Sequence, residues 1–328
     1  MKAVRCHLFG SPEKLSFDEV SELSGPGENE VIISVKAAGV NFPDTLIIQG
    51  KYQFQPEFPF VPGGEAAGVV KAVGSGVDFL QKGDRVLAGT GWGSFAEEVI
   101  APASNTFKIP NSVGYQEAAI LAEAYGTSYH ALVDRAKIKK GETLLVLGAS
   151  GGVGIAAVQI GKALGATVIA AASSEEKLAF CKNNGADHLI NYSQANVKEK
   201  AKEITGGKGV DVVYDPVGGD LTEPALRSIA WNGRYLVVGF AAGSIPKIPL
   251  NLPLLKGCSI IGVFWGGFFR KEPEENRKNF IELIKLLEKG AINPPIHEVF
   301  KLADAGAALR EIMERKVIGK IVLSVEDV

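Results

Sequence analysis

The stretch Thr143-Leu144-Leu145-Val146-Leu147-Gly148-Ala149-Ser150-Gly151-Gly152-Val153-Gly154 decides the fold of this chain. Its first five residues are apolar or β-branched, which is typical of a strand buried on both faces. Apolar residues then recur at helical spacing as far as Leu164, and a second apolar strand follows at 166–171. A strand, a glycine turn, a helix and a strand in this order predict a nucleotide-binding βαβ unit.

The glycines of this turn have different predicted roles. Gly148 permits a sharp reversal of the chain, and Gly154 lets the helix approach the sheet closely. Gly151 and Gly152 leave backbone N–H groups open to a pyrophosphate at the positive end of the helix dipole. A purely structural turn is the alternative, because glycine makes up 39 of the 328 residues and the spacing departs from G-x-G-x-x-G by one residue. The flanking strands favour a dinucleotide, with predicted contacts at Ser150, Gly151, Gly152 and Val153.

Length and composition predict a globular protein of two domains, because single cores rarely grow past roughly 250 to 300 residues. A net charge of −2 gives no reason to expect a nucleic acid or an acidic membrane surface as a partner. The apolar runs are shorter than the ~20 residues that span a bilayer, so a cytoplasmic location is the default expectation. The chain has three cysteines without close spacing and four scattered histidines, which predict neither disulfides nor a metal site.

The chain divides into two patterns of secondary structure. Up to about Glu123, short strands at 31–37, 67–73, 83–88 and 95–100 are separated by Gly and Pro clusters, which suggests a partly open β-barrel. A linker helix at 116–134 leads into an α/β segment that predicts a doubly wound parallel sheet. Its six strands are expected at 143–147, 166–171, 188–190, 210–214, 235–238 and 259–264, with helices at 175–184, 197–205 and 221–230.

The C-terminal segment does not continue this alternation. It predicts a helix at 273–289, a strand at 297–300, a helix at 304–315 and a strand at 320–324. We therefore expect it to return to the first domain and complete it.

Six motifs lie along these two patterns. They are Ala38-Gly39-Val40-Asn41-Phe42-Pro43-Asp44, Pro62-Gly63-Gly64-Glu65-Ala66-Ala67-Gly68, Gly83-Asp84-Arg85-Val86, Gly148 to Gly154, Asp215-Pro216-Val217-Gly218-Gly219 and Gly319-Lys320-Ile321-Val322-Leu323. The patterns and motifs together resemble the medium-chain dehydrogenase/reductase superfamily, and most of all its zeta-crystallin-like NADPH:quinone oxidoreductases. The resemblance implies a GroES-like catalytic domain over 1–123 and 266–328, and a Rossmann dinucleotide-binding domain over 124–265.

Zinc-dependent alcohol dehydrogenases of the same superfamily carry a Cys and a His where this chain has Asn41 and Gly64. An amide and a missing side chain do not supply the donors that zinc requires, and Glu65 alone cannot hold the ion. No metal is therefore predicted, and the absence of a zinc ion to stabilise an alkoxide disfavours simple alcohol oxidation.

The second strand of the wound sheet predicts the cofactor. It ends in small residues, hydroxyls and a lysine instead of the carboxylate that accepts both ribose hydroxyls of NAD. Ser173, Ser174 and Lys177 can bind a 2′-phosphate, and the resemblance adds Tyr192 beside it. A capping box from Ser173 to Glu176 is the alternative. NADP(H) is favoured over NAD(H).

The resemblance implies further residues at the reacting end. Asn41, with Asp44 nearby, is placed close to the nicotinamide, Tyr52 lines the substrate cleft, and Thr127 holds the carboxamide. Structural roles as turn, core and helix residues remain open for Asp44, Tyr52 and Thr127. The remaining predicted contacts follow the fifth and sixth strands of the wound sheet, at Gly239, Phe240, Phe264, Trp265 and Gly266. Aromatic rings there suit a flat, apolar acceptor.

Three functions remain open. The first is hydride transfer from NADPH to a small, planar, quinone-like acceptor, with the proton supplied by water or by Tyr52. The second is reduction of activated C=C bonds in enals, enones or enoyl thioesters. The third is a non-catalytic NADPH-binding or RNA-associated role, which the charge does not favour. The apolar strand at 259–264 predicts an exposed sheet edge and a homodimer formed across it.

Overall fold

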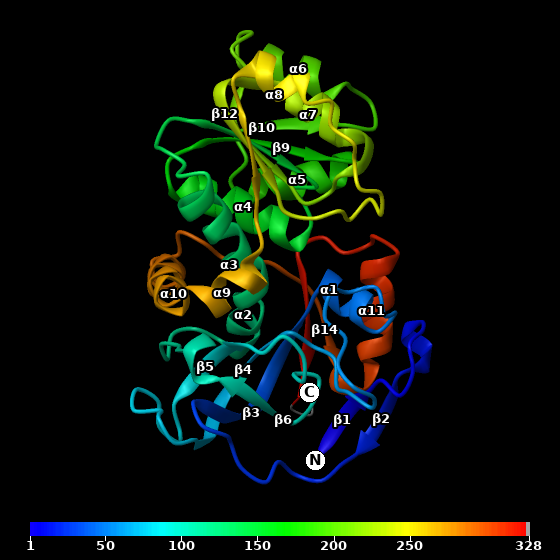
Figure 1. Ribbon diagram of the computed structural model, residues 1–328, viewed down its shortest axis with the longest axis vertical. Helices are drawn as coiled ribbons and strands as arrows, with labels where there is room; N and C mark the ends of the chain where they lie inside the picture. Colours follow the sequence, from blue (N-terminus) through cyan, green and yellow to red (C-terminus); the bar gives the residue numbers. More distant parts are fainter. Residues whose placement is uncertain (326–328) are drawn as a thin grey trace. The chain divides into compact units, whose positions relative to one another are not determined.

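The computed structural model describes residues 1–325 (Figure 1). Contacts divide the chain into two compact units. The first comprises Met1–Ala124, Gly266–Glu288 and the segment from Asn293 onward, and the second comprises Tyr125–Trp265 and Lys289–Ile292. No helix within residues 1–325 combines the length and the apolar character needed to cross a membrane.

The second unit contains a six-stranded sheet in the order β10-β9-β8-β11-β12-β13, with every neighbouring pair parallel. This is the doubly wound order of dinucleotide-binding proteins, with a crossover on each side of the first strand. The strands are β8 (Thr143–Leu147), β9 (Thr167–Ala172), β10 (His188–Asn191), β11 (Val210–Asp215), β12 (Ile229–Val237) and β13 (Ser259–Gly262).

Helices cover the strands of this sheet. The helix α4 contacts β8 and β9, and α5 contacts β9 and β10. The helices α6, α7 and α8 pack next to one another, and the core of this unit includes Leu145 and Leu147 of β8 and Ala225 and Leu226 of α7. The bounds are α4 (Gly152–Ala163), α5 (Glu175–Asn183), α6 (Val197–Ile204), α7 (Thr222–Arg227) and α8 (Asn251–Lys256).

The first unit is built on a seven-stranded sheet in the order β14-β15-β3-β4-β5-β7, with β6 also paired to β3. Within the described residues this path begins at β14 and ends at β7, so the sheet does not close into a barrel. In Figure 1 the red C-terminal strand β15 lies beside the blue strand β3, with which it pairs antiparallel. The strands are β3 (Glu30–Val40), β4 (Glu65–Val73), β5 (Arg85–Gly89), β6 (Glu98–Pro102), β7 (Thr106–Lys108), β14 (Ile296–Lys301) and β15 (Lys320–Ser324).

Smaller elements complete this unit. The strands β1 (Lys2–Arg5) and β2 (Ser16–Glu19) form a separate antiparallel pair. The helix α1 (Phe42–Ile47) follows β3 directly and contacts α11 (Ala305–Met313). The helix α10 (Pro273–Glu288) packs through Phe280, whose ring stacks on Phe107 with centroids 4.2 Å apart.

Three expectations about elements are wrong. The predicted helix 221–230 ends at Arg227, because Ile229 pairs with Val210 and begins β12. The sixth strand ends at Gly262, and residues from Trp265 onward form α9 (Trp265–Lys271), which Gly266 and Gly267 conceal because glycine has low helix propensity. The linker is not one helix but α2 (Tyr115–Ala119), α3 (Ala122–Tyr129) and a π-helical turn, His130–Arg135.

Candidate functional site

The turn after β8 is shaped to receive an anion. Gly148 has a φ of +57°, which reverses the chain, and α4 begins four residues later at Gly152. The first N–H groups of a helix have no partners within it, so the N-terminus of α4 offers free donors and a positive dipole end. Ser150, Gly151, Gly152 and Val153 all lie in this turn or in the first turn of α4.

Two glycines of the turn have different constraints. A Cβ on Gly154 would lie 2.3 Å from the backbone oxygen of Gly148, so only glycine allows α4 to pack this closely. A Cβ on Gly151 would meet nothing closer than 3.5 Å, from the same oxygen. The predicted packing role of Gly154 is confirmed, whereas Gly151 borders open space.

The ends of β9 and β10 bring the predicted 2′-phosphate residues to one edge of the sheet. Ser193 Oγ donates to the backbone oxygen of Ser173 at 3.0 Å, and the N–H of Tyr192 donates to that of Ala172 at 3.1 Å. Ser174 is the N-cap of α5, and its hydroxyl accepts from the N–H of Lys177 at 3.4 Å. A cap therefore exists, but Ser174 forms it and not the predicted pair of Ser173 and Glu176.

The remaining predicted residues of this unit follow β12 and β13. Gly239 and Phe240 follow the end of β12 after one intervening residue, at the same carboxyl edge as the glycine turn, and Phe240 is 38% exposed. Phe264 is half exposed, whereas Trp265 is buried at the start of α9. Gly266 follows in α9 and belongs to the first unit.

Hydrogen bonds fix the rotation of α3 about its axis. Tyr125 Oη donates to Gln159 Oε1 of α4 at 2.7 Å, and Ser128 Oγ donates to the Val153 backbone oxygen at 2.9 Å. Both side chains are fully buried. Thr127 is partly exposed, and it lies one helical turn after Glu123 on the same face of α3.

The first unit contains a buried polar cluster, defined here as Asn41, Asp44, Glu65, Glu123 and Lys320. Lys320 Nζ lies 2.9 Å from Glu65 Oε1 and also donates to Asn41 Oδ1. Asn41 Nδ2 donates to Glu65 Oε1 at 2.7 Å. The Asn41 amide therefore bridges the acid and the base, and all three side chains are at most 8% exposed.

The two other carboxyls of the cluster are held differently. Asp44 accepts the N–H of Asn41 at 2.7 Å, which caps the first turn of α1. Glu123 donates its backbone N–H to Glu65 Oε2 at 2.8 Å. Its own carboxyl fills the space beside Gly64, where an added Cβ would lie 1.9 Å from Glu123 Oε1.

Burial changes the acidity of this cluster. It raises the pKa of Asp44 to about 7, with Glu65 adding to the shift and Lys320 opposing it. The pKa of the Glu123 carboxyl is also raised well above its ordinary value, first by burial and then by Asp44 and Glu65. One ammonium faces three carboxyls, so the excess of negative charge favours the protonated forms of Asp44 and Glu123.

Tyr52 stands beside this cluster in an aromatic group. Its ring packs edge-to-face on Phe54, and the Arg270 guanidinium lies 4.7 Å from the Phe54 ring centroid. Tyr52 also packs on the core of this unit. Burial, Glu123 and Asp44 together raise the pKa of its hydroxyl.

Sequence reasoning missed Glu123 and Lys320. Each had a signal, because a lysine in the apolar strand 320–324 and a glutamate among alanines at 122–124 require a buried partner. Lys320 lies within the motif Gly319-Lys320-Ile321-Val322-Leu323, which by itself indicates no role for its side chain.

The residues of this cluster do not fit zinc. The Asn41 amide is bonded to Lys320 and Glu65, and the Glu123 carboxyl takes the space beside Gly64. In the part of the chain that the structure describes, converging His, Cys, Asp and Glu ligands occur at His297, Glu298 and Glu311, on β14 and α11. No step of a reaction is therefore assigned to a metal in the cluster.

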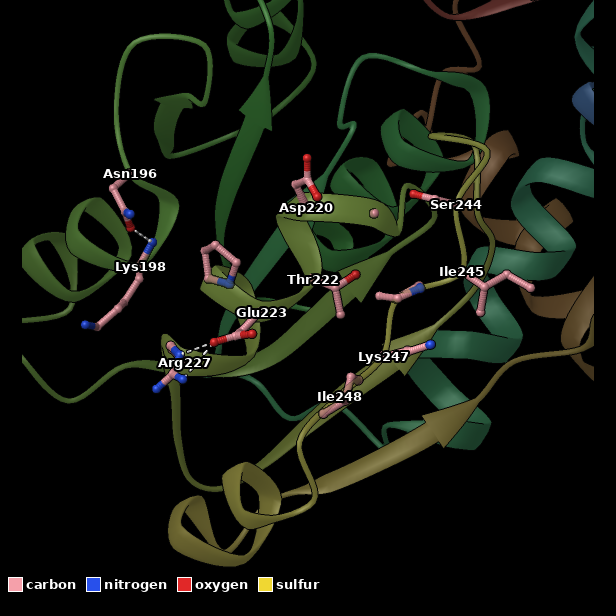
Figure 2. Close-up of a pocket in the computed structure, with 13 residues that line it drawn as sticks. Asn196, Lys198, Asp220, Thr222, Glu223, Arg227, Ser244, Ile245, Lys247 and Ile248 are labelled. Carbon is pink, nitrogen blue, oxygen red and sulfur yellow. Dashed lines mark hydrogen bonds and ion pairs between the residues drawn. The ribbon is translucent and has the colours of Figure 1, made fainter.

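A pocket of about 570 Å³ lies elsewhere in the second unit (Figure 2). It is lined by the start of α7, the segment 244–248 and Asn196 and Lys198 at the start of α6. Figure 2 shows Arg227 joined to Glu223, so this basic side chain is already paired. None of the predicted site residues lines this pocket.

Comparison with known proteins assigns the two units to known domains. Residues 27–111 match the alcohol dehydrogenase GroES-like domain, and residues 152–289 match the family described as zinc-binding dehydrogenase. The chain is 39% identical over 325 residues to a quinone oxidoreductase-like protein 2 homolog from Nematostella vectensis, covering 98% of this chain and 88% of that one. It is 40% identical over 301 residues to quinone oxidoreductase-like protein 2 from Rattus norvegicus, covering 92% and 86%.

Solved structures agree with this assignment. The Escherichia coli quinone oxidoreductase complexed with NADPH has a TM-score of 0.91 at 32% identity, covering 99% of this chain and all of that one. A probable oxidoreductase from Mycobacterium abscessus has a TM-score of 0.89 at 39% identity, covering 99% and 98%. The fold is that of a two-domain α/β oxidoreductase. The chain belongs to the medium-chain dehydrogenase/reductase superfamily and, within it, to the quinone oxidoreductase family.

Proposed function

We propose that this protein transfers hydride from NADPH to a small, planar, quinone-like acceptor without a metal ion. The proposal rests on the contacts inside the polar cluster. Lys320 occupies Glu65, and the Glu123 carboxyl takes the space beside Gly64, so the cluster has no donor set for zinc. The family supports it, because relatives of similar length bear the name quinone oxidoreductase and one structure is described as complexed with NADPH.

The pyrophosphate of the cofactor would lie on the glycine turn, held by N–H groups of Ser150 to Val153. Ser173, Ser174, Lys177 and Tyr192 would surround the adenosine 2′-phosphate at the ends of β9 and β10. Further cofactor contacts are proposed in each unit separately. They are Thr127, Gly239, Phe240, Phe264 and Trp265 in the second unit, and Asn41, Asp44 and Gly266 in the first. The bound cofactor supplies the hydride, so the protein needs no nucleophile of its own.

The acceptor would pack against Tyr52. The neighbouring Phe54 ring and Arg270 guanidinium are flat groups that suit stacking on a quinone or enone. Orientation of the acceptor at near-attack distance is then the main catalytic contribution of the chain.

The proposal is tested by following NADPH oxidation with several small benzoquinones and naphthoquinones, an enone and a crotonyl thioester. Quinone turnover with NADPH that exceeds turnover with NADH supports the proposal. Faster reduction of the enone or thioester would make C=C bond reduction the function instead. Tight NADPH binding without reduction of any acceptor would favour a non-catalytic role.

We further propose a homodimer formed through β13. This strand ends the sheet of the second unit, and Ile260 on it is 38% exposed. Trp231, Leu254 and Leu255 of the same unit are each more than 70% exposed, which is unusual for large apolar side chains. Sedimentation equilibrium should give twice the chain mass, and Ile260→Lys should shift it toward the monomer. A wild-type monomer at micromolar concentration would refute this arrangement.

A further inference from the structure

We propose that Glu123 is the general acid that protonates the reduced acceptor, an inference that rests on the proposed function. Hydride addition to a quinone leaves an oxyanion that still needs one proton. Glu123 would give up its carboxyl proton, so that its O–H bond breaks and an O–H bond forms on the acceptor. The resulting carboxylate recovers a proton from water, and the overall reaction consumes NADPH, the quinone and one solvent proton.

Hydrogen bonding singles out Glu123 among the three carboxyls of the cluster. Both oxygens of Glu65 are engaged, by Lys320 and Asn41 on one side and by the Glu123 N–H on the other. Asp44 is held by the Asn41 N–H and is 3% exposed. Within residues 1–325 no hydrogen bond reaches the Glu123 carboxyl, so its proton is not committed to another group.

The exposure of the three carboxyl residues to solvent also points to Glu123. Glu65 is fully buried and Asp44 nearly so, whereas Glu123 is partly exposed. Its carboxyl extends into the space that the missing side chain of Gly64 leaves open. Glu123 is therefore the carboxyl of this cluster that can meet both an acceptor and solvent, as proton transfer and reprotonation require.

Burial and the charges around Glu123 favour its protonated form. The groups facing it are Asp44 from α1, Glu65 from β4 and Lys320 from β15, with Tyr52 nearby and Arg270 beyond it. Burial first, and then the carboxyls of Asp44 and Glu65, raise the pKa of Glu123, and the single ammonium is already paired with Glu65. The Glu123 carboxyl therefore holds its proton more tightly than an ordinary carboxyl does.

The acidity of the Tyr52 hydroxyl disfavours this residue as the proton donor. Burial and the nearby Glu123 and Asp44 raise the pKa of its hydroxyl, so it is a weaker acid than an ordinary phenol. Proton transfer from Tyr52 to a phenolate-like product, which resembles an ordinary phenol in acidity, would therefore run uphill. Tyr52 is left with packing against the acceptor.

The experiment uses Glu123→Gln, which keeps the shape of the side chain, and Glu288→Gln as the matched control on the exposed end of α10. The first readout needs no cofactor. The infrared carbonyl stretch of a protonated carboxyl should be present in the wild-type protein at pH 7, unchanged in Glu288→Gln and diminished in Glu123→Gln. An unchanged band in Glu123→Gln would overturn the inference.

The second readout is turnover with a naphthoquinone. Glu123→Gln should lose about 10²-fold in kcat, with little change in NADPH affinity, and should lose the alkaline limb of the pH profile.

Glu123→Ala opens a space beside Gly64, and added acetic acid or formic acid should restore part of its activity. Full activity of Glu123→Gln with an unchanged pH profile would overturn the inference even where the wild type reduces quinones. A wild type that reduces no quinone refutes the proposed function, and with it this role, whatever the infrared band shows.

Discussion

Lys320 Nζ lies 2.9 Å from Glu65 Oε1, and the two side chains are 3% and 0% exposed. They come from β15 and β4, on either side of β3 in one sheet. Removing one partner of such a pair leaves the other charge buried and uncompensated. The pair therefore ties the last described strand to the body of the first unit.

Lys320→Met should destabilise the protein by about 3 to 5 kcal/mol, because Glu65 then keeps a buried charge without its ammonium. Urea denaturation measures the change, with Lys301→Met on the exposed face of β14 as the control. The double variant Lys320→Met with Glu65→Gln should recover part of the loss. Equal denaturation midpoints for Lys320→Met and the wild type would show that the pair does not stabilise the fold.

Two glycines of one motif should respond oppositely to alanine. A Cβ on Gly64 meets the mobile end of Glu123 at 1.9 Å, so Gly64→Ala should cost little stability but displace that carboxyl and weaken its infrared band. A Cβ on Gly68 would lie 2.0 Å from the Ser34 backbone oxygen, and Gly68→Ala should cost several kcal/mol, on the order of other overpacked cores. Thermal unfolding compares them, and similar losses in the two variants would contradict this explanation.

The glycine turn gives a second matched pair. Gly154→Ala forces a Cβ within 2.3 Å of the Gly148 oxygen, so α4 must shift, and NADPH affinity should fall at least tenfold, or about 1.4 kcal/mol. Gly151→Ala has ordinary contact distances within the protein, and its fold should stay as stable as the wild type. Calorimetric titration with NADPH and thermal unfolding measure the two effects. Normal NADPH binding by Gly154→Ala would show that the close packing of α4 against the turn is not needed for cofactor binding.

Stability should fall as pH rises from about 4 to 7. The pKa of Asp44 is raised to about 7 in the folded protein, so the folded state keeps a proton that the unfolded chain has already released. Stabilisation is therefore full below the unfolded pKa and lost as pH rises through the folded one, by up to about 4 kcal/mol. Urea midpoints at pH 5 and pH 8 measure the change. A midpoint that rises across this range would show that Asp44 is ionised in the fold.

The end of β9 should determine cofactor preference. Ser173→Asp adds a carboxylate that repels a 2′-phosphate and accepts ribose hydroxyls, so kcat/KM should shift from NADPH toward NADH by at least tenfold. Ser173→Ala is the control, since it removes the hydroxyl without adding charge. Steady-state kinetics with both cofactors measures the ratio, and an unchanged ratio in Ser173→Asp would place the 2′-phosphate elsewhere.

Local patterns were sufficient for much of the fold. The run Thr143–Leu147 appears as β8 with the predicted bounds, and Gly154 has the predicted close contact. The pattern failed at 221–230, where apolar residues fit both helical and strand spacing over a few positions. There, Ile229 became part of a strand because it pairs with Val210 of β11, which precedes it in the sequence.

The sequence by itself determined the class of fold, the dinucleotide turn and the loss of the zinc ligands, because each depends on residue type and spacing within a short segment. Tertiary structure decided which groups surround Asn41 and Gly64. Lys320 reaches Glu65 and Asn41 through strand pairing, and Glu123 reaches Gly64 through the placement of α3. Such contacts join residues separated by as many as 279 positions, and the distance between their side chains is fixed by packing and not by any local pattern.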